Sequence, residues 1–277
     1  MIRLLVDSAA DIKQDNAENI YVVPLSINIL GKDYLDGLEI QNDDFYKMLT
    51  SGKVYSKTAA PSPEMFLKVF EEVKANGDEL ICILLSSGVS GTYQSACIAK
   101  DAIEYKNIHI IDSLTGSYGV KILTIEAQKM IKEGASCKQI IEKLHELKKR
   151  VQIFLSVDTL DYLHRGGRLD KKTAFIGNLA KVKPIIYVSP EGKVEMYSKT
   201  IGLKKAIKFI INLALEKEVD TNYPFYSIYT YGTENPQKFE EFAKENGIVV
   251  SERSQFGPAV GTHVGSEAFG CIYISKK

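Results

Sequence analysis

The 277-residue sequence has no tryptophan, only four cysteines and no excess of either charge. The cysteines stand far apart, at positions 82, 97, 137 and 271, and no CxxC pair occurs among them. This scatter argues against a redox motif or a cysteine-based metal site, and the four dispersed histidines add no cluster of zinc ligands. Thirty-five basic residues balance 35 acidic ones, which argues against a nucleic-acid-binding protein. We expect no metal and no nucleic-acid partner.

Long apolar runs are also absent. No stretch approaches the roughly 20 residues of a transmembrane helix, and the start "MIRLLVDSAAD" lacks the apolar region and cleavage site of a signal peptide. We therefore expect a soluble cytoplasmic protein. The length and an ordinary composition, 45% hydrophobic and 25% charged, predict one large domain or two modest ones.

Several motifs of phosphate and acyl chemistry are missing as well. Neither GxxxxGK[ST] nor GxGxxG occurs, and the GxSxG elbow of hydrolases fails by one residue at Gly88-Val89-Ser90-Gly91. A triad of Ser90, His263 and Asp112 can be imagined, but nothing in their spacing demands it.

The first half of the chain alternates short apolar runs with amphipathic stretches. We expect strands at "IRLLVDS", "ELICILLSS" and "NIHIIDS". Ser62 before Pro63 predicts a helix start, and Ser136 with Gln139 forms a capping-box pattern. This alternation predicts an α/β domain over residues 1–150, with an open parallel sheet and flanking helices.

The second half changes character near Val151. A helix is expected directly after "HRGGRLD", and "KPIIYVSPEGKVEMYSKT" predicts a hairpin around a Pro-Glu-Gly turn. Further short strands and helices follow. We therefore expect a second α/β domain over residues 151–277, with a mixed or antiparallel sheet and with the ligand between the two domains.

Polar residues follow the expected strands of the first half. The pairs are Asp7-Ser8, Ser86-Ser87 and Asp112-Ser113. The carboxyl ends of parallel strands share one edge of a sheet, so these clusters should converge in space. The loop from Ser86 to Thr92 also runs into a helix, where free backbone N–H groups favour an anion and Gly88 and Gly91 allow close approach. The competing interpretation is that Ser90 merely caps the helix.

Three residues that lie far from these motifs in the sequence are further candidates for the anion site. Thr58 precedes a predicted helix and offers a hydroxyl, although alone it is typical of a turn. His263 stands among glycines, which favours a close backbone approach. Arg168 follows a glycine pair and either anchors that loop or pairs with the anion. The residues thus predict an anion site suited to a carboxylate or a phosphate, without choosing between them.

The order and spacing of several short motifs carry a resemblance over nearly the whole chain. They are "VDSAADI", "TAAPSP", "SSGVSGTYQSA", "IIDS", "DYLHRGGRL", "KPII" and the late "HVG". The chain resembles the DegV family, which includes the FakB-type fatty-acid-binding proteins. The resemblance implies a non-enzymatic carrier without a cofactor, which holds a fatty acid between two α/β domains with its chain in an apolar tunnel. It also implies an ATP-dependent fatty acid kinase as partner, whose acyl-phosphate product feeds phospholipid synthesis.

Carried over by position, the resemblance assigns the fatty acid carboxylate to Thr58, Ser90, Arg168 and His263. The supporting loop residues are Ser87, Gly88, Gly91, Thr92, Asp112 and Ser113. For the loop from Ser86 to Thr92, the resemblance therefore favours binding of a carboxylate over simple capping of the helix by Ser90.

Two departures from the family pattern stand out. The Gly-Pro-Gly expected after the histidine is replaced by Gly265-Ser266-Glu267, which brings a carboxylate toward an anion site unless Glu267 points away. A basic cluster around residues 199–205, which would face the kinase, is interrupted by Ile201-Gly202-Leu203. The alternatives are an enzyme, such as a hydrolase using Ser90 on a small carboxylated or phosphorylated metabolite, and a regulatory module with lipid as filler.

Overall fold

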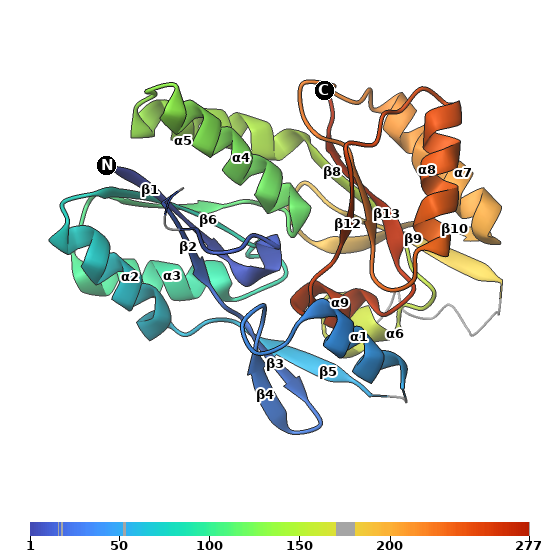
Figure 1. The fold of residues 1–277 in the computed structure, drawn as a ribbon, viewed down its shortest axis with the longest axis horizontal. Helices are drawn as coiled ribbons and strands as arrows, with labels where there is room; N and C mark the ends of the chain where they lie inside the picture. The colour runs from blue at the N-terminus through green and yellow to red at the C-terminus, as the bar shows by residue number, and fades with distance from the viewer. Residues whose placement is uncertain (16, 18, 52–53, 170–180, 277) are drawn as a thin grey trace.

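The computed structural model describes residues 1–276 except for 16, 18, 52–53 and 170–180 (Figure 1). Within this part of the chain the strands form sheets of four, six and three strands. The four-stranded sheet is parallel throughout and comes from the first half of the chain. Its strands, in spatial order, are β2 (Ile20–Val23), β1 (Ile2–Asp7), β6 (Glu79–Leu84) and β7 (Ile108–Asp112).

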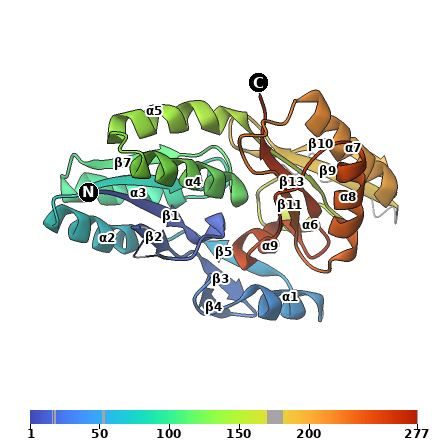
Figure 2. The same cartoon turned by 45° about the horizontal axis from the view of Figure 1, so that its top comes forward.

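Helices cover both faces of this parallel sheet, as Figures 1 and 2 show. They are α2 (Pro63–Ala75) and α3 (Thr92–Ile103) on one face, with α4 (Tyr118–Lys132) and α5 (Cys137–Leu147) on the other. Alternation along the strands decides which side chain meets which pair of helices. Cys82 packs with Phe70 of α2, whereas its neighbours Ile81 and Ile83 pack with Leu144 of α5.

The six-stranded sheet is built from the second half and is mixed, because β11 pairs parallel with β12 while the other pairs are antiparallel. Its strands are, in spatial order, β10 (Val194–Ile201), β9 (Val182–Val188), β8 (Val151–Ser156), β13 (Phe269–Ile274), β11 (Tyr226–Tyr229) and β12 (Glu252–Gln255). Helices α7 (Leu203–Glu216) and α8 (Glu234–Glu245) cover one face. The other face turns toward α4 and α5, so the cores of the two sheets meet.

A small antiparallel sheet lies apart from both larger ones. It contains β4 (Lys32–Leu35), β3 (Ser26–Ile29) and β5 (Ser56–Ala59), and is accompanied by α1 (Asn42–Thr50). Helix α9 (Pro258–Val264) packs against this unit and against α6 (Asp161–Arg165). Short 3₁₀ turns at Ser8–Ala10 and Lys148–Arg150 complete the described elements. The small sheet was not anticipated, because its strands are only four residues long.

The predicted fold class is confirmed in both halves. Ser62 and Pro63 open α2, and Ser136 forms the predicted capping box with Gln139 at the start of α5. The predicted hairpin is formed by β9 and β10. The helix expected directly after Asp170 falls outside the described residues.

Candidate functional site

The three polar strand ends of the parallel sheet converge as predicted, but two of them serve the loop itself. The Asp7 carboxylate accepts a hydrogen bond from the Leu85 backbone N–H at 2.7 Å. The Asp112 carboxylate accepts from the Ser87 N–H at 3.1 Å and from its hydroxyl at 2.5 Å. Burial raises the pKa of Asp7 to about 6. These acids shape the loop after β6 and do not line the cavity described below.

The backbone N–H groups from Leu85 to Ser90 are used within the protein, which leaves the start of α3 as the part of the loop where backbone donors could meet an anion. Besides Leu85 and Ser87, the donors occupied by backbone or hydroxyl oxygens are those of Ser86, Gly88, Val89 and Ser90. A backbone donor that is already satisfied has little to gain from a ligand. Between Leu85 and Ser90, the polar contribution of the loop therefore comes from hydroxyl groups.

The tip of the β9–β10 hairpin closes over the same loop. The Ser86 hydroxyl donates to the Gly192 carbonyl at 2.7 Å, and a Cβ atom at Gly88 would lie 2.6 Å from that oxygen. Gly88 is thus required by this contact between the two halves of the chain, and not by a ligand. Gly91 is less constrained, since a Cβ there would meet only the Ala60 side chain at 3.7 Å.

Thr58 and His263 form one pair at the cavity. Thr58 lies on β5 and His263 in α9, and Thr58 Oγ1 is 2.8 Å from His263 Nε2. Burial and the nearby Arg168 charge lower the pKa of His263 to about 3, so the imidazole is neutral. The backbone passes close to it at Gly166, where a Cβ would lie 2.2 Å from Nδ1, whereas Gly261 and Gly265, its neighbours in sequence, approach Tyr46 and Tyr162 instead. That Nδ1 atom has no hydrogen-bond partner among the described residues.

Ser90 lies just before α3, where the sequence suggested either a helix cap or a residue of an anion site. Its hydroxyl lies 2.8 Å from the Thr92 hydroxyl and accepts from the Thr92 N–H at 3.3 Å, so it does support the helix start. It also lines the cavity, together with Thr58 and His263. Ser113 has a purely local role, since its hydroxyl donates to the Thr115 carbonyl in a buried turn.

Arg168 reaches across the interface between the two halves. Its Nε donates to the Val89 carbonyl of the Ser86–Thr92 loop at 2.9 Å, and Nη1 donates to the Gly166 carbonyl at 2.5 Å. The anchoring role is therefore present. Burial lowers the pKa of Arg168, and no carboxylate pairs with it among the described residues. A half-buried cation without an acidic partner is costly unless an anion joins it.

These side chains meet at an otherwise apolar cavity between the halves. Its volume is about 110 Å³, counted as the space open to the centre of a water molecule, and all empty space within it, open solvent included, amounts to about 820 Å³. Apolar side chains from every neighbouring element form most of the wall, among them Leu25, Leu85, Ile153, Leu155, Leu163, Ile186, Val188, Val194, Phe256, Val260 and Val264. No aspartate or glutamate is among the described residues that line it. Glu267, which the sequence placed near an anion site, is exposed and does not line the cavity.

The imagined catalytic triad is not assembled. The Ser90 hydroxyl bonds Thr92, His263 bonds Thr58, and Asp112 bonds Ser87. A nucleophilic serine needs a hydrogen-bonded base that is itself oriented by a third group. Sequence reasoning missed Gly192 and Thr115 at the cavity wall. Gly192 belongs to the predicted Pro-Glu-Gly turn, but the turn alone does not indicate that it reaches the cavity.

This geometry defines a class of protein: an α/β protein with two large sheets and an apolar cavity between its halves. The wall of the cavity carries hydroxyls, a neutral histidine and an arginine that has no carboxylate partner among the described residues. The chain belongs to the DegV family, whose model, described as that of an uncharacterised protein, matches residues 1–276. A DegV domain-containing protein of Caldanaerobacter subterraneus is 38% identical, with 99% of each chain covered.

Solved structures show the same fold. A protein of Thermus thermophilus, described as a fatty-acid-binding DegV family protein, has a TM-score of 0.88 at 28% identity, with 99% of both chains covered. A protein of Eubacterium ventriosum, described as binding stearic acid, has a TM-score of 0.89 at 26% identity, covering 100% of this chain and 99% of that one. In the described part of this chain, no helix has the length and apolar character to span a membrane.

Proposed function

We propose that this protein binds a long-chain fatty acid, with the carboxylate at Thr58, Ser90, Arg168 and His263 and the acyl chain in the apolar cavity. The observation that carries the proposal is the half-buried guanidinium of Arg168, which has no acidic partner among the described residues and stands at a wall otherwise made mainly of hydroxyls and apolar side chains. A carboxylate supplies the missing charge and accepts from the hydroxyls. The ligands named for the Thermus and Eubacterium relatives support this choice.

The neutral histidine sets the direction of the hydrogen bonds. Nδ1 of His263 faces the Gly166 backbone without a partner, and an orphaned donor there would be less favourable than an orphaned acceptor. We therefore place the proton on Nε2, so that His263 donates to Thr58 Oγ1. The Thr58 hydroxyl is then left with its own proton to donate, and a carboxylate is its natural acceptor.

The acyl chain and the carboxylate of a fatty acid would contribute to binding in different ways. Each buried methylene contributes about 0.8 kcal/mol, so a long acyl chain supplies most of the affinity. A hydrogen bond to a charged group adds roughly 1.5–3 kcal/mol and fixes orientation. The proposed head-group contacts therefore serve mainly to position the carboxylate.

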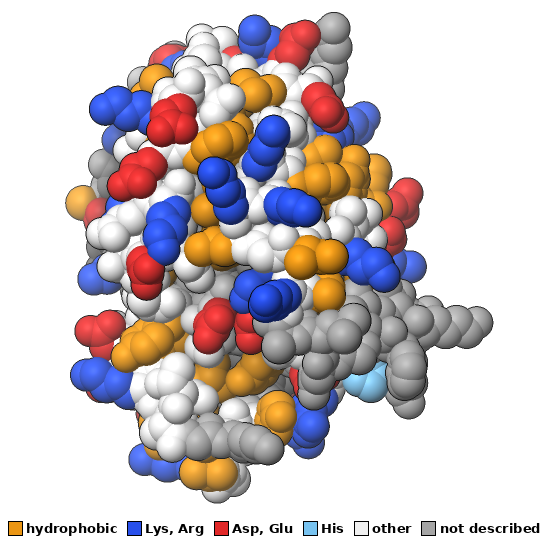
Figure 3. Space-filling view, turned by 90° about the vertical axis from the view of Figure 1, so that its right-hand side faces the viewer, with side chains coloured by type: hydrophobic (Ala, Val, Ile, Leu, Met, Phe, Trp, Pro, Cys, Tyr) orange, Lys and Arg blue, Asp and Glu red, His pale blue; other side chains and the backbone are white. Residues whose placement is uncertain are grey.

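We propose further that the bound carboxylate is presented to an ATP-dependent fatty acid kinase, which makes an acyl-phosphate for phospholipid synthesis. An exposed basic face supports a docking role: Figure 3 shows lysine and arginine side chains set among hydrophobic ones on the side of the molecule that carries α7 and β10. Lys199, Lys204 and Lys205 are exposed there, and Ile201, which interrupts the basic stretch, is 63% exposed. An apolar residue on the surface is compatible with a partner interface.

The two proposed domains have separate tasks in this scheme. Residues 1–150 supply Thr58 and Ser90, and residues 151–277 supply Arg168 and His263 and close over the acyl chain. Division after residue 150 is supported by the sheets, because the four-stranded one ends with β7 and the six-stranded one begins with β8.

Mass spectrometry of an organic extract of the purified protein tests the lipid proposal. We expect one acyl chain per protein molecule, and rebinding of added fatty acid after delipidation. Protein that yields no acyl chain and binds none would exclude the proposal. Phosphoryl transfer to the bound acid by an added fatty acid kinase tests the second step separately, because lipid binding without transfer would overturn only the kinase partnership.

A further inference from the structure

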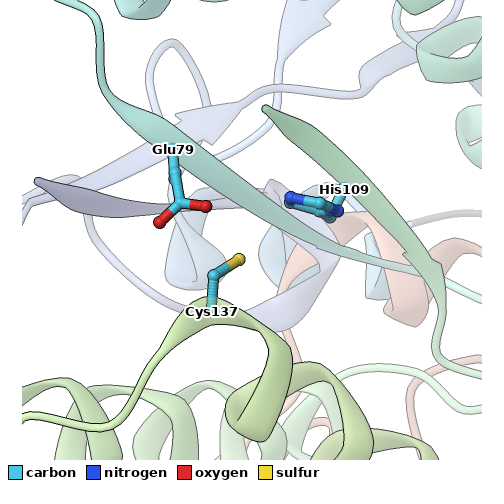
Figure 4. A group of neighbouring side chains, drawn as sticks. All are labelled: Glu79, His109 and Cys137. Carbon is cyan, nitrogen blue, oxygen red and sulfur yellow. The ribbon is translucent and has the colours of Figure 1, made fainter. Parts of the chain in front are cut away.

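A second group of polar side chains lies at the opposite edge of the parallel sheet. Glu79 is the first residue of β6, His109 lies near the start of β7, and Cys137 is the first residue of α5. Their ligating atoms all lie within 4.8 Å of one another, and Figure 4 shows the three side chains converging. The site of the proposed carboxylate lies at the other ends of these strands.

The register of the sheet explains the convergence. Ile81 is the partner of His109 across the parallel pair β6–β7, so these two side chains share a face. Glu79 is two residues before Ile81 and therefore projects from the same face. That face is the one covered by α5, whose first residue brings the thiol of Cys137 over the pair.

The three side chains are otherwise unoccupied. Among the described residues, none of the three has a side-chain hydrogen bond or a salt bridge, although Cys137 is buried and the other two are half-buried. The adjacent Asp78 behaves differently, since its carboxylate is held by Arg3 and by the N-terminal amine. No side-chain atom of Glu79 or His109 is among the fully buried polar atoms that lack a partner, so water reaches both groups. A metal ion that joins them would therefore replace water and would break no bond within the described chain.

A thiol, an imidazole and a carboxylate are the three side-chain types that bind zinc. Around a tetrahedral zinc ion with bonds of about 2.0–2.3 Å, neighbouring ligand atoms lie about 3.4–3.8 Å apart. A spacing of at most 4.8 Å closes to that value by small side-chain rotations, without movement of the strands. A water molecule would complete the four ligands.

We propose that Glu79, His109 and Cys137 bind one zinc ion, which fastens the start of α5 to the parallel sheet. This inference does not depend on the lipid proposal. It also reverses the expectation of no metal site, which rested on the dispersal of cysteine and histidine along the sequence. The opposing factor is that burial and the Glu79 charge raise the pKa of Cys137 to about 11, whereas burial and the charge of Lys100 lower the pKa of His109 and so favour the neutral imidazole that binds a metal. Zinc binding must therefore displace the thiol proton.

Cobalt(II) is the probe that tests the site, because it replaces zinc and reports a thiolate ligand by a charge-transfer band in the near ultraviolet. The full chain, free of any affinity tag and treated with a chelator, is titrated with Co²⁺ and then with Zn²⁺. We expect one Co²⁺ per chain, the thiolate band, and loss of the band when Zn²⁺ displaces Co²⁺. Cys137→Ser should abolish the band.

His109→Gln and Glu79→Gln should each weaken Co²⁺ binding by at least about 10-fold, since loss of even a hydrogen-bond partner of a ligand costs about 10–100-fold. Cys97→Ser and His145→Gln are matched controls outside the cluster and should leave binding unchanged. The proposal is overturned if wild-type protein shows no thiolate band, or if the band survives Cys137→Ser or disappears in Cys97→Ser. If Cys137→Ser does not fold, His109→Gln, at a half-buried position, decides between these outcomes.

Discussion

Replacement of Thr58 by valine is the sharpest test of the carboxylate site. Valine keeps the shape of threonine and suits the β5 strand, but it removes the hydroxyl that contacts His263 Nε2 at 2.8 Å. In the proposed hydrogen-bond network this hydroxyl relays the imidazole N–H to the ligand carboxylate. The substitution therefore removes a head-group donor and leaves the apolar wall in place.

The expected loss follows from the value of one hydrogen bond to a charged group, roughly 1.5–3 kcal/mol. Since about 1.4 kcal/mol corresponds to a factor of 10 in the dissociation constant, Thr58→Val should weaken fatty acid binding about 10- to 100-fold. The acyl chain stays buried, so binding persists. A fatty alcohol of the same length carries no negative charge and should lose much less.

Calorimetric titration of delipidated protein with the acid and the alcohol provides the measurement. Ser56→Ala is the matched control, because Ser56 lies on the same strand and its hydroxyl contacts Thr262 of α9 at 2.8 Å without lining the cavity. This control should bind both ligands like wild type. Equal weakening of acid and alcohol by Thr58→Val, or no weakening of either, would refute the assignment.

Three further substitutions test other parts of the structure. Burial raises the pKa of Asp11 from 3.8 to about 8, so the stability that its protonated form contributes is complete below pH 3.8 and is lost as pH rises through 8. Asp11→Asn should therefore flatten the fall in melting temperature between pH 7 and 9. An unchanged slope would contradict this. Gly88→Ala should lower the free energy of unfolding, measured by chemical denaturation, by about 1–3 kcal/mol because the added Cβ meets the hairpin at Gly192. Gly91→Ala should lower it little, and equal losses for the two variants would refute the contact. Arg168→Gln should reduce the rise in melting temperature on adding fatty acid more than it lowers that of lipid-free protein; the reverse result would make its role structural.

The larger elements of the fold were predictable because their signals are local. The parallel strands are short apolar runs, and the helix starts at Ser62 and Ser136 carry their own capping residues. Convergence of Asp7, Ser87 and Asp112 also followed, because parallel strands end at one edge.

The details that decide the chemistry were not local. The Asp7 and Asp112 carboxylates accept hydrogen bonds from backbone N–H groups at the start of the loop that follows β6. The need for glycine at position 88 arises from Gly192, which lies on a hairpin far away in the sequence. The motif comparison brought Thr58 and His263 to the site, but only the structure shows that they contact each other. Tertiary contacts of this kind leave no periodicity in a single sequence.

The proposed head-group residues come from both halves of the chain, and this has a mechanical consequence. Thr58 and His263 bond across the halves, and Arg168 binds the Val89 carbonyl of the loop that presents Ser90. A carboxylate bound among them would add further bonds to the same interface. Because a ligand that binds only the folded state stabilises it, fatty acid binding should hold the two halves together as well as fill the cavity. If the proposed site is correct, release of the acyl chain would require these cross-interface bonds to open, and the carboxylate contacts would help to keep the cavity closed.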